Sequence, residues 1–157
     1  IGDSAGAAHI LSMAIYARNE GIPLPAGLVM ISPFVDMTLT SDSIQNRAKA
    51  DPMFSVVPLQ RGVSAYCGEI LPADPSVSPV FAELDDLPPM LIQVGSDEIL
   101  LDDALLLEQR AQAAGVQVSC TVHEGMWHNF QMFSAFVEKA DKALWAIADF
   151  VRRGEDE

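Results

Sequence analysis

Apolar residues form two kinds of segment along the chain. Three short apolar stretches predict buried strands: residues 28–32, 90–95 and 116–122. Three longer segments repeat apolar residues at the spacing of a helix: residues 5–20, 102–114 and 134–152. Strands that alternate with helices predict an α/β fold, in which parallel strands are flanked by helices.

The last helical segment carries an apolar stripe that is expected to pack on the sheet. Its members recur three or four residues apart: Phe136, Val137, Ala140, Leu144, Ile147 and Val151. By contrast, residues 32–89 are rich in proline, aspartate and serine, and only one short helix is expected there, near residues 59–67. A long stretch with so little regular structure is typical of a functional surface.

The chain begins with a serine between two glycines, Gly2-Asp3-Ser4-Ala5-Gly6, directly before the first helical segment. This pattern is typical of a nucleophile elbow, in which a serine on a sharp strand-to-helix turn exposes its hydroxyl. The glycines are expected to leave room for the neighbouring backbone. Since no strand is recognisable before Ser4, the chain is expected to be the C-terminal part of a longer enzyme. Residues 28–32 should then form an unpaired sheet edge.

Charge and composition narrow the classes of partner. Nine basic residues against 22 acidic ones give a net charge of −13, which argues against nucleic acid and anionic membranes. No apolar run is long enough to span a membrane. The two cysteines lack the spacing of metal ligands and are expected to be reduced, which favours a cytoplasmic location.

A serine nucleophile needs a base and an acid that orients the base. Of the three histidines, His9 lies on the helix after Ser4 and His123 ends a predicted strand. His128 follows the last strand, and active sites of α/β proteins form at the carboxyl ends of strands. Two acids, Asp97 and Glu98, directly follow strand 90–95, and their positions alone leave both open. The order serine, acid, histidine is that of the α/β-hydrolases.

Several motifs together resemble the hormone-sensitive-lipase-type esterases, a branch of the α/β-hydrolase family. They are Gly-Asp-Ser-Ala-Gly at 2–6, Ser-Pro-Phe-Val-Asp at 32–36, Asp-Pro-Met-Phe at 51–54, Leu-Pro-Pro-Met-Leu-Ile-Gln-Val-Gly at 87–95, Leu-Leu-Asp-Asp at 100–103 and Gly-x-x-His-x-Phe at 125–130. The resemblance implies an α/β-hydrolase fold from the nucleophile elbow onward. Residues 1–157 would form the C-terminal portion of one catalytic domain, without its N-terminal cap and oxyanion-loop half.

The resemblance also implies roles for individual residues. The position of the family's triad aspartate falls on Glu98, so this chain has Glu for Asp there and Ile99 for the following proline. Ser4 would be the nucleophile and His128 the base. The Ala5 N–H would be one oxyanion donor, whereas the family's His-Gly-Gly-Gly loop is absent from this sequence.

The function implied is a serine carboxylesterase that hydrolyses short- to medium-chain acyl esters without metal or organic cofactor. Five residues in loops at the site are candidates to line the substrate pocket: Phe34, Met53, Phe54, Met126 and Trp127. Two alternatives stay open: a hydrolase or acyltransferase acting on another acyl donor, and a fragment without turnover. Family members often dimerise through the last strand and helix, here residues 116–122 and 134–152.

Overall fold

The fold is built on one parallel sheet. The computed structural model describes residues 1–155, and its sheet has four strands in the order β1-β2-β3-β4. These are β1 (Gly2–Asp3), β2 (Leu28–Ile31), β3 (Met90–Gly95) and β4 (Val118–His123), and each is parallel to its neighbour. The prediction of an α/β fold with parallel strands and flanking helices is confirmed.

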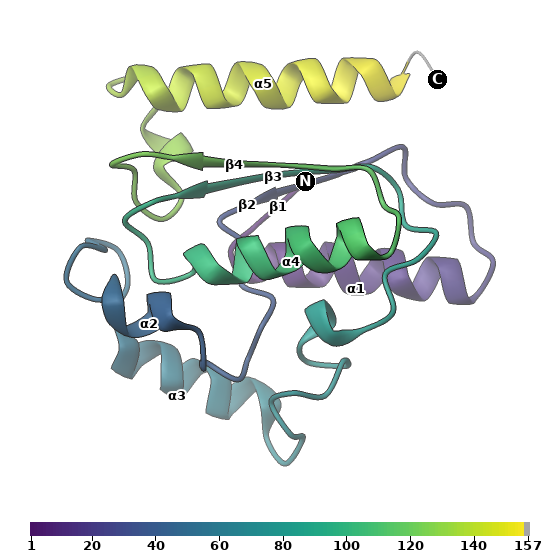
Figure 1. Ribbon diagram of the computed structural model, residues 1–157, viewed down its shortest axis with the longest axis horizontal. Helices are drawn as coiled ribbons and strands as arrows, with labels where there is room; N and C mark the ends of the chain where they lie inside the picture. Colours follow the sequence, from purple (N-terminus) through teal and green to yellow (C-terminus); the bar gives the residue numbers. More distant parts are fainter. Residues whose placement is uncertain (156–157) are drawn as a thin grey trace.

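Helices cover both faces of the sheet (Figure 1). On one face lie α1 (Ala5–Asn19) and α4 (Leu101–Ala113), which bury Leu11 and Leu107 in the main apolar core. On the other face lies α5 (Glu138–Glu155), which packs Ile147 against β2 and β3. The continuous apolar runs of β2 and β3 are explained by this burial on both sides. No helix in residues 1–155 is long and apolar enough to cross a membrane.

The elbow does have a strand that enters it, and the expectation that this strand is missing was wrong. β1 is only two residues long, and it pairs with β2 through Gly2 opposite Met30 and Asp3 opposite Ile31. The N–H of Ser4 extends this pairing to the carbonyl of Ile31. The prediction of an unpaired edge over 28–32 is therefore wrong at Met30 and Ile31, whereas Leu28 and Val29 have no partner in β1. Two residues are too few to produce a periodic pattern, so the sequence could not reveal this strand.

The last helix begins later than its apolar pattern predicted. Residues Phe130–Phe133 form a separate 3₁₀ turn, η2, and Phe136 lies outside α5 with 90% of its surface exposed. The residues that α5 buries are Ala140, Ala143 and Ile147, whereas Leu144 and Val151 of the predicted stripe are 38% and 41% exposed. The prediction of Phe136 in the stripe was wrong because its backbone N–H donates to the carbonyl of Phe133 in a turn, and α5 begins only at Glu138.

Residues 32–89 contain more structure than predicted. The expected short helix is α3 (Val56–Cys67), and two short elements, α2 (Asp42–Asn46) and η1 (Pro79–Phe81), accompany it. α2 and α3 lie toward the carboxyl ends of the strands (Figure 1). They enclose a second apolar cluster with Ile99 and Leu100.

Two carboxylates at the start of α4 hold the segment after β2 in place. Oδ2 of Asp103, a residue that is 1% exposed, accepts the N–H groups of Val35 and Asp36, both at 3.0 Å. Asp102 accepts the N–H of Ser43 at 2.8 Å. The chain from Val35 to Ser43 is thereby tied to the helix that follows β3.

Asp103 should make the stability of the protein depend on pH. Burial raises the pKa of Asp103 from 3.8 to about 8, although its hydrogen bonds from Asp36 and Val35 oppose this rise. Between these two values the folded state holds a proton that the unfolded state has lost. The free energy of unfolding should therefore fall as pH rises from about 4 to about 8, by at most about 1.4 kcal/mol per pH unit.

The variant Asp103→Asn separates this effect from other titrations, because its amide oxygen can accept the same two backbone bonds without ionising. Urea unfolding at pH 5 and pH 7.5 should show a smaller loss of stability for Asp103→Asn than for the wild type. Equal pH dependence of the two proteins would contradict an Asp103 that is protonated in the fold.

Candidate active site

Ser4 occupies the sharp turn between β1 and α1. Its backbone has φ 52° and ψ −123°, a conformation that a residue with a side chain rarely adopts. A Cβ at Gly2 would collide with the backbone carbonyl of Gly6, so this close approach requires glycine at position 2. A Cβ at Gly6 would meet only Asp3 Oδ1, at 3.9 Å, so the expectation of crowding does not hold there.

His128 lies in the loop between β4 and η2 and is 2% exposed. Its Nδ1 lies 2.9 Å from Oε2 of Glu98, which is fully buried. Its Nε2 is buried and has no hydrogen-bond partner among residues 1–155. When Nδ1–H donates to a carboxylate, Nε2 carries the free lone pair and can accept a proton.

The two candidate acids lie in different environments. Glu98 reaches His128, and its other oxygen, Oε1, accepts the N–H of Gly95 at the end of β3. Asp97 is partly exposed, and its Oδ1 accepts the hydroxyl of Ser96 at 3.1 Å. The structure therefore brings Glu98, and not Asp97, to the histidine.

Ser32 connects the loops that follow the strands. It is fully buried at the end of β2, with φ 46°. Its hydroxyl donates to Glu98 Oε1 at 2.9 Å and accepts the N–H of Asn129 at 3.1 Å. The Asn129 side chain in turn donates to Asp3 Oδ2 at 2.9 Å. Hydrogen bonds thus link the elbow, the acid and the histidine loop.

The sequence analysis missed Ser32 and Asn129 as parts of the site. Ser32 stands in the Ser-Pro-Phe-Val-Asp motif, and Asn129 follows His128 directly. The motif was the available signal for Ser32. Its partner Glu98 is 66 positions away in the sequence, so no local sequence pattern indicates this hydrogen bond.

Asp51 holds an aromatic ring against the histidine. Its Oδ1 accepts the N–H groups of Met53 and Phe54, and its Oδ2 accepts the N–H of Ile99 at 3.0 Å. The ring of Phe54 meets the His128 ring edge-on, with centroids 4.5 Å apart. This ring covers one side of the imidazole.

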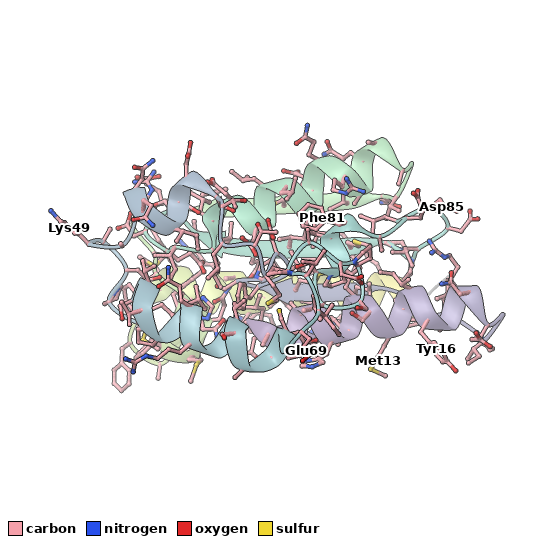
Figure 2. The ribbon with its side chains drawn as sticks, turned by 90° about the horizontal axis from the view of Figure 1, so that it is seen from below. Met13, Tyr16, Lys49, Glu69, Phe81 and Asp85 are labelled. Atoms are coloured by element: carbon pink, nitrogen blue, oxygen red, sulfur yellow. The ribbon has the colours of Figure 1, made fainter. Side chains whose placement is uncertain are left out.

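A mostly apolar cavity of about 330 Å³ opens beside Ser4. It lies between α3 and the first turns of α1, where His9 and Tyr66 meet edge-on. Figure 2 views these two helices from below, with Glu69 just beyond the end of α3 and Met13 and Tyr16 on the outer side of α1.

The candidate pocket residues do not all reach this cavity. Phe34 and Phe54 line it, and so does Ala5, the predicted oxyanion donor. Trp127 lies elsewhere, against Phe133, with ring centroids 5.6 Å apart, in the cluster that η2 forms with α5. Met53 and Met126 are not among its lining residues either.

The two other histidines, His9 and His123, lie outside the Glu98–His128 pair. His9 lines the cavity wall, and His123 packs on Phe130 with centroids 4.9 Å apart. Burial, and then the charge of Lys139, lower the pKa of His123. Within residues 1–155, no group of three or more His, Cys, Asp or Glu side chains is placed to hold a metal ion.

Known proteins resemble this chain in sequence. A family model described as the alpha/beta hydrolase fold matches residues 1–132. An "Esterase" of Acinetobacter venetianus is 45% identical over 95% of this chain and 50% of its own length. An "Acetyl-hydrolase" of Streptomyces hygroscopicus is 35% identical over 99% of this chain and 52% of its own length.

Solved structures also resemble this chain, both in fold and in sequence. A hormone-sensitive lipase from a metagenome library has a TM-score of 0.94 and 42% identity, over 98% of this chain and 53% of that one. The esterase EstE5, soaked with p-nitrophenyl butyrate, has a TM-score of 0.95 and 37% identity, over 99% of this chain and 52% of that one. The chain spans about half the length of these relatives.

Removing the Ser32 hydroxyl should destabilise the protein. Ser32→Ala leaves the buried Asn129 N–H unpaired and takes one donor from Glu98, which should cost about 1–3 kcal/mol of unfolding free energy. Ser32→Gly removes the same hydroxyl but suits the positive φ, so its loss should be smaller by about 0.5–1 kcal/mol. Urea unfolding measures both variants. A Ser32→Ala protein as stable as the wild type would contradict this account of the network.

Proposed function

The chain belongs to the α/β-hydrolase family, in its hormone-sensitive-lipase-type esterase branch, and on that premise we propose that it carries the catalytic residues of a serine carboxylesterase. Ser4 is the nucleophile, His128 the general base and Glu98 the acid that orients the histidine. The observation that carries the proposal is the buried hydrogen bond between Glu98 and His128, which leaves Nε2 free to take a proton.

The reaction proceeds in two halves. Ser4 Oγ attacks the ester carbonyl carbon while His128 Nε2 takes the hydroxyl proton. Glu98 stabilises the resulting imidazolium. The carbon–oxygen bond to the alcohol then breaks, and His128 returns the proton to the leaving alcohol. Water repeats the sequence on the acyl-enzyme, which releases the carboxylic acid and restores Ser4.

Ala5 supplies one donor for the oxyanion. As the first residue of α1, it has an N–H among those that lack a carbonyl partner within the helix, at the positive end of the helix dipole. The family resemblance implies further donors from a glycine-rich loop that this sequence does not contain. Each such donor is worth about 10²–10³ in rate.

The substrates in this proposal are esters with short to medium acyl chains. The cavity beside Ser4 is small and apolar, and Phe34 forms part of its wall. Two relatives support acyl chains of this length, since one is named an acetyl-hydrolase and another was soaked with a butyrate ester. A role for Trp127 in substrate binding stays a prediction without support from its position.

The domain assignment is also part of the proposal. The matched relatives are about twice as long as this chain, which supports residues 1–157 as one portion of a longer catalytic domain. That this portion is the C-terminal one stays a prediction from the family resemblance. A homodimer through residues 116–122 and 134–152 and a cytoplasmic location stay predictions.

Hydrolysis of p-nitrophenyl acetate and butyrate by the full-length protein tests the function. Ser4→Ala should abolish turnover. Glu98→Gln should lower kcat about 10⁴-fold, because the neutral amide no longer stabilises the imidazolium or fixes the correct tautomer. Asp97→Asn should change kcat by less than about threefold, since the Asp97 carboxylate is bonded to Ser96 and the partner of His128 Nδ1 is Glu98.

Circular dichroism and thermal unfolding of each variant separate loss of catalysis from loss of fold. Turnover that survives in Ser4→Ala would refute the serine mechanism. A Glu98→Gln protein that is folded and fully active, or an equal loss in Asp97→Asn, would refute Glu98 as the acid.

A further inference from the structure

One face of α3 forms a wall of the cavity beside Ser4. The residues on this face recur three or four positions apart: Pro58, Leu59, Gly62, Val63 and Tyr66. Gly62 lies at the centre of this face. The opposite wall comes from the first turns of α1, with Ala5, Ala8 and His9.

Glycine at position 62 is unfavourable for the helix itself. A glycine inside a helix costs about 1 kcal/mol relative to alanine, because it loses more backbone freedom on folding. Gly62 is seven positions into α3, which runs from Val56 to Cys67. The local structure should therefore favour almost any other helix-forming residue.

Neither backbone conformation nor packing requires the glycine. Gly62 is not among the glycines with positive φ. Apart from its two chain neighbours and the backbone of its own helix turns, no atom of the described structure would lie within 4 Å of a Cβ built on Gly62. Gly2 and Gly95 differ from Gly62 in packing, since a Cβ at either would collide with backbone atoms. What glycine preserves at position 62 is open space on the cavity side of α3.

We propose that Gly62 is a specificity-determining residue, which keeps the cavity open for the apolar chain of the ester that Ser4 attacks. The inference rests on the proposed esterase function. Ser4 and Gly62 line the same cavity, so a chain attached to the reacting carbonyl group runs between α1 and α3. A side chain at position 62 would fill that space and exclude longer chains, while acetyl esters would still fit.

The test compares Gly62→Ala, Gly62→Leu and Gly62→Phe with the matched series Ser64→Ala, Ser64→Leu and Ser64→Phe. Ser64 is exposed on α3 and does not line the cavity. Each full-length variant is assayed with p-nitrophenyl acetate, butyrate and octanoate. A second set of substrates varies the alcohol, from methyl to octyl acetate, to show whether the acyl or the alcohol chain occupies the cavity.

In each series, the chain-length ratio is kcat/KM for the longest ester divided by kcat/KM for the shortest ester. Gly62→Phe should lower this ratio by about tenfold or more in one of the two series, acyl or alcohol. Gly62→Leu should have a smaller effect in the same direction. The Ser64 variants should leave both ratios within about twofold. Gly62→Ala should keep most activity and raise the thermal midpoint, because alanine favours the helix.

Two outcomes would overturn the inference while the wild type still hydrolyses acetate in a Ser4-dependent manner. One is an unchanged chain-length ratio in Gly62→Phe in both series. The other is an equal loss on all esters, which would mean a general disturbance of the site. Failure of the wild type to hydrolyse any ester would instead refute the proposed function.

Discussion

The structure depends on one fully buried carboxylate. An ionised side chain away from water is tolerated only when donors surround it. Glu98 has three: the Ser32 hydroxyl and the Gly95 N–H on one oxygen, and His128 Nδ1 on the other. The requirement to satisfy this group fixes the ends of β2 and β3 and the loop after β4 relative to one another.

The parallel sheet is what brings these donors together. Strands β1, β2, β3 and β4 end at the same edge, so the loops that follow them can exchange hydrogen bonds over short distances. Asp3 and Asn129 extend the network to the elbow, and Asp51 holds Phe54 against the imidazole. The strained backbone at Ser4 and Ser32 is maintained by this surrounding set of bonds.

Much of this arrangement follows from the sequence, and the rest does not for physical reasons. The central strands have continuous apolar runs and α4 has a helical apolar pattern, and the order of Ser4, acid and His128 can be read directly from the sequence. The positions of Asp97 and Glu98 after β3 leave both open, because the choice depends on which side chain turns inward. Only the family resemblance pointed to Glu98, the side chain that contacts His128 in the structure. The apolar pattern of the last helix already includes Phe136, although the backbone at Phe136 forms a turn before α5 begins. Ser32 was missed because its partner is distant in sequence.

The central claim is that the Glu98–His128 pair activates Ser4 and no other serine. Reaction of the folded full-length protein with a fluorophosphonate, followed by peptide mass spectrometry, tests this most directly, because the reagent forms a stable adduct only with an activated nucleophile. The account predicts a single adduct on Ser4 that is absent when the protein is unfolded in urea before labelling. A folded protein that remains unlabelled, or an adduct on a different serine, would contradict it.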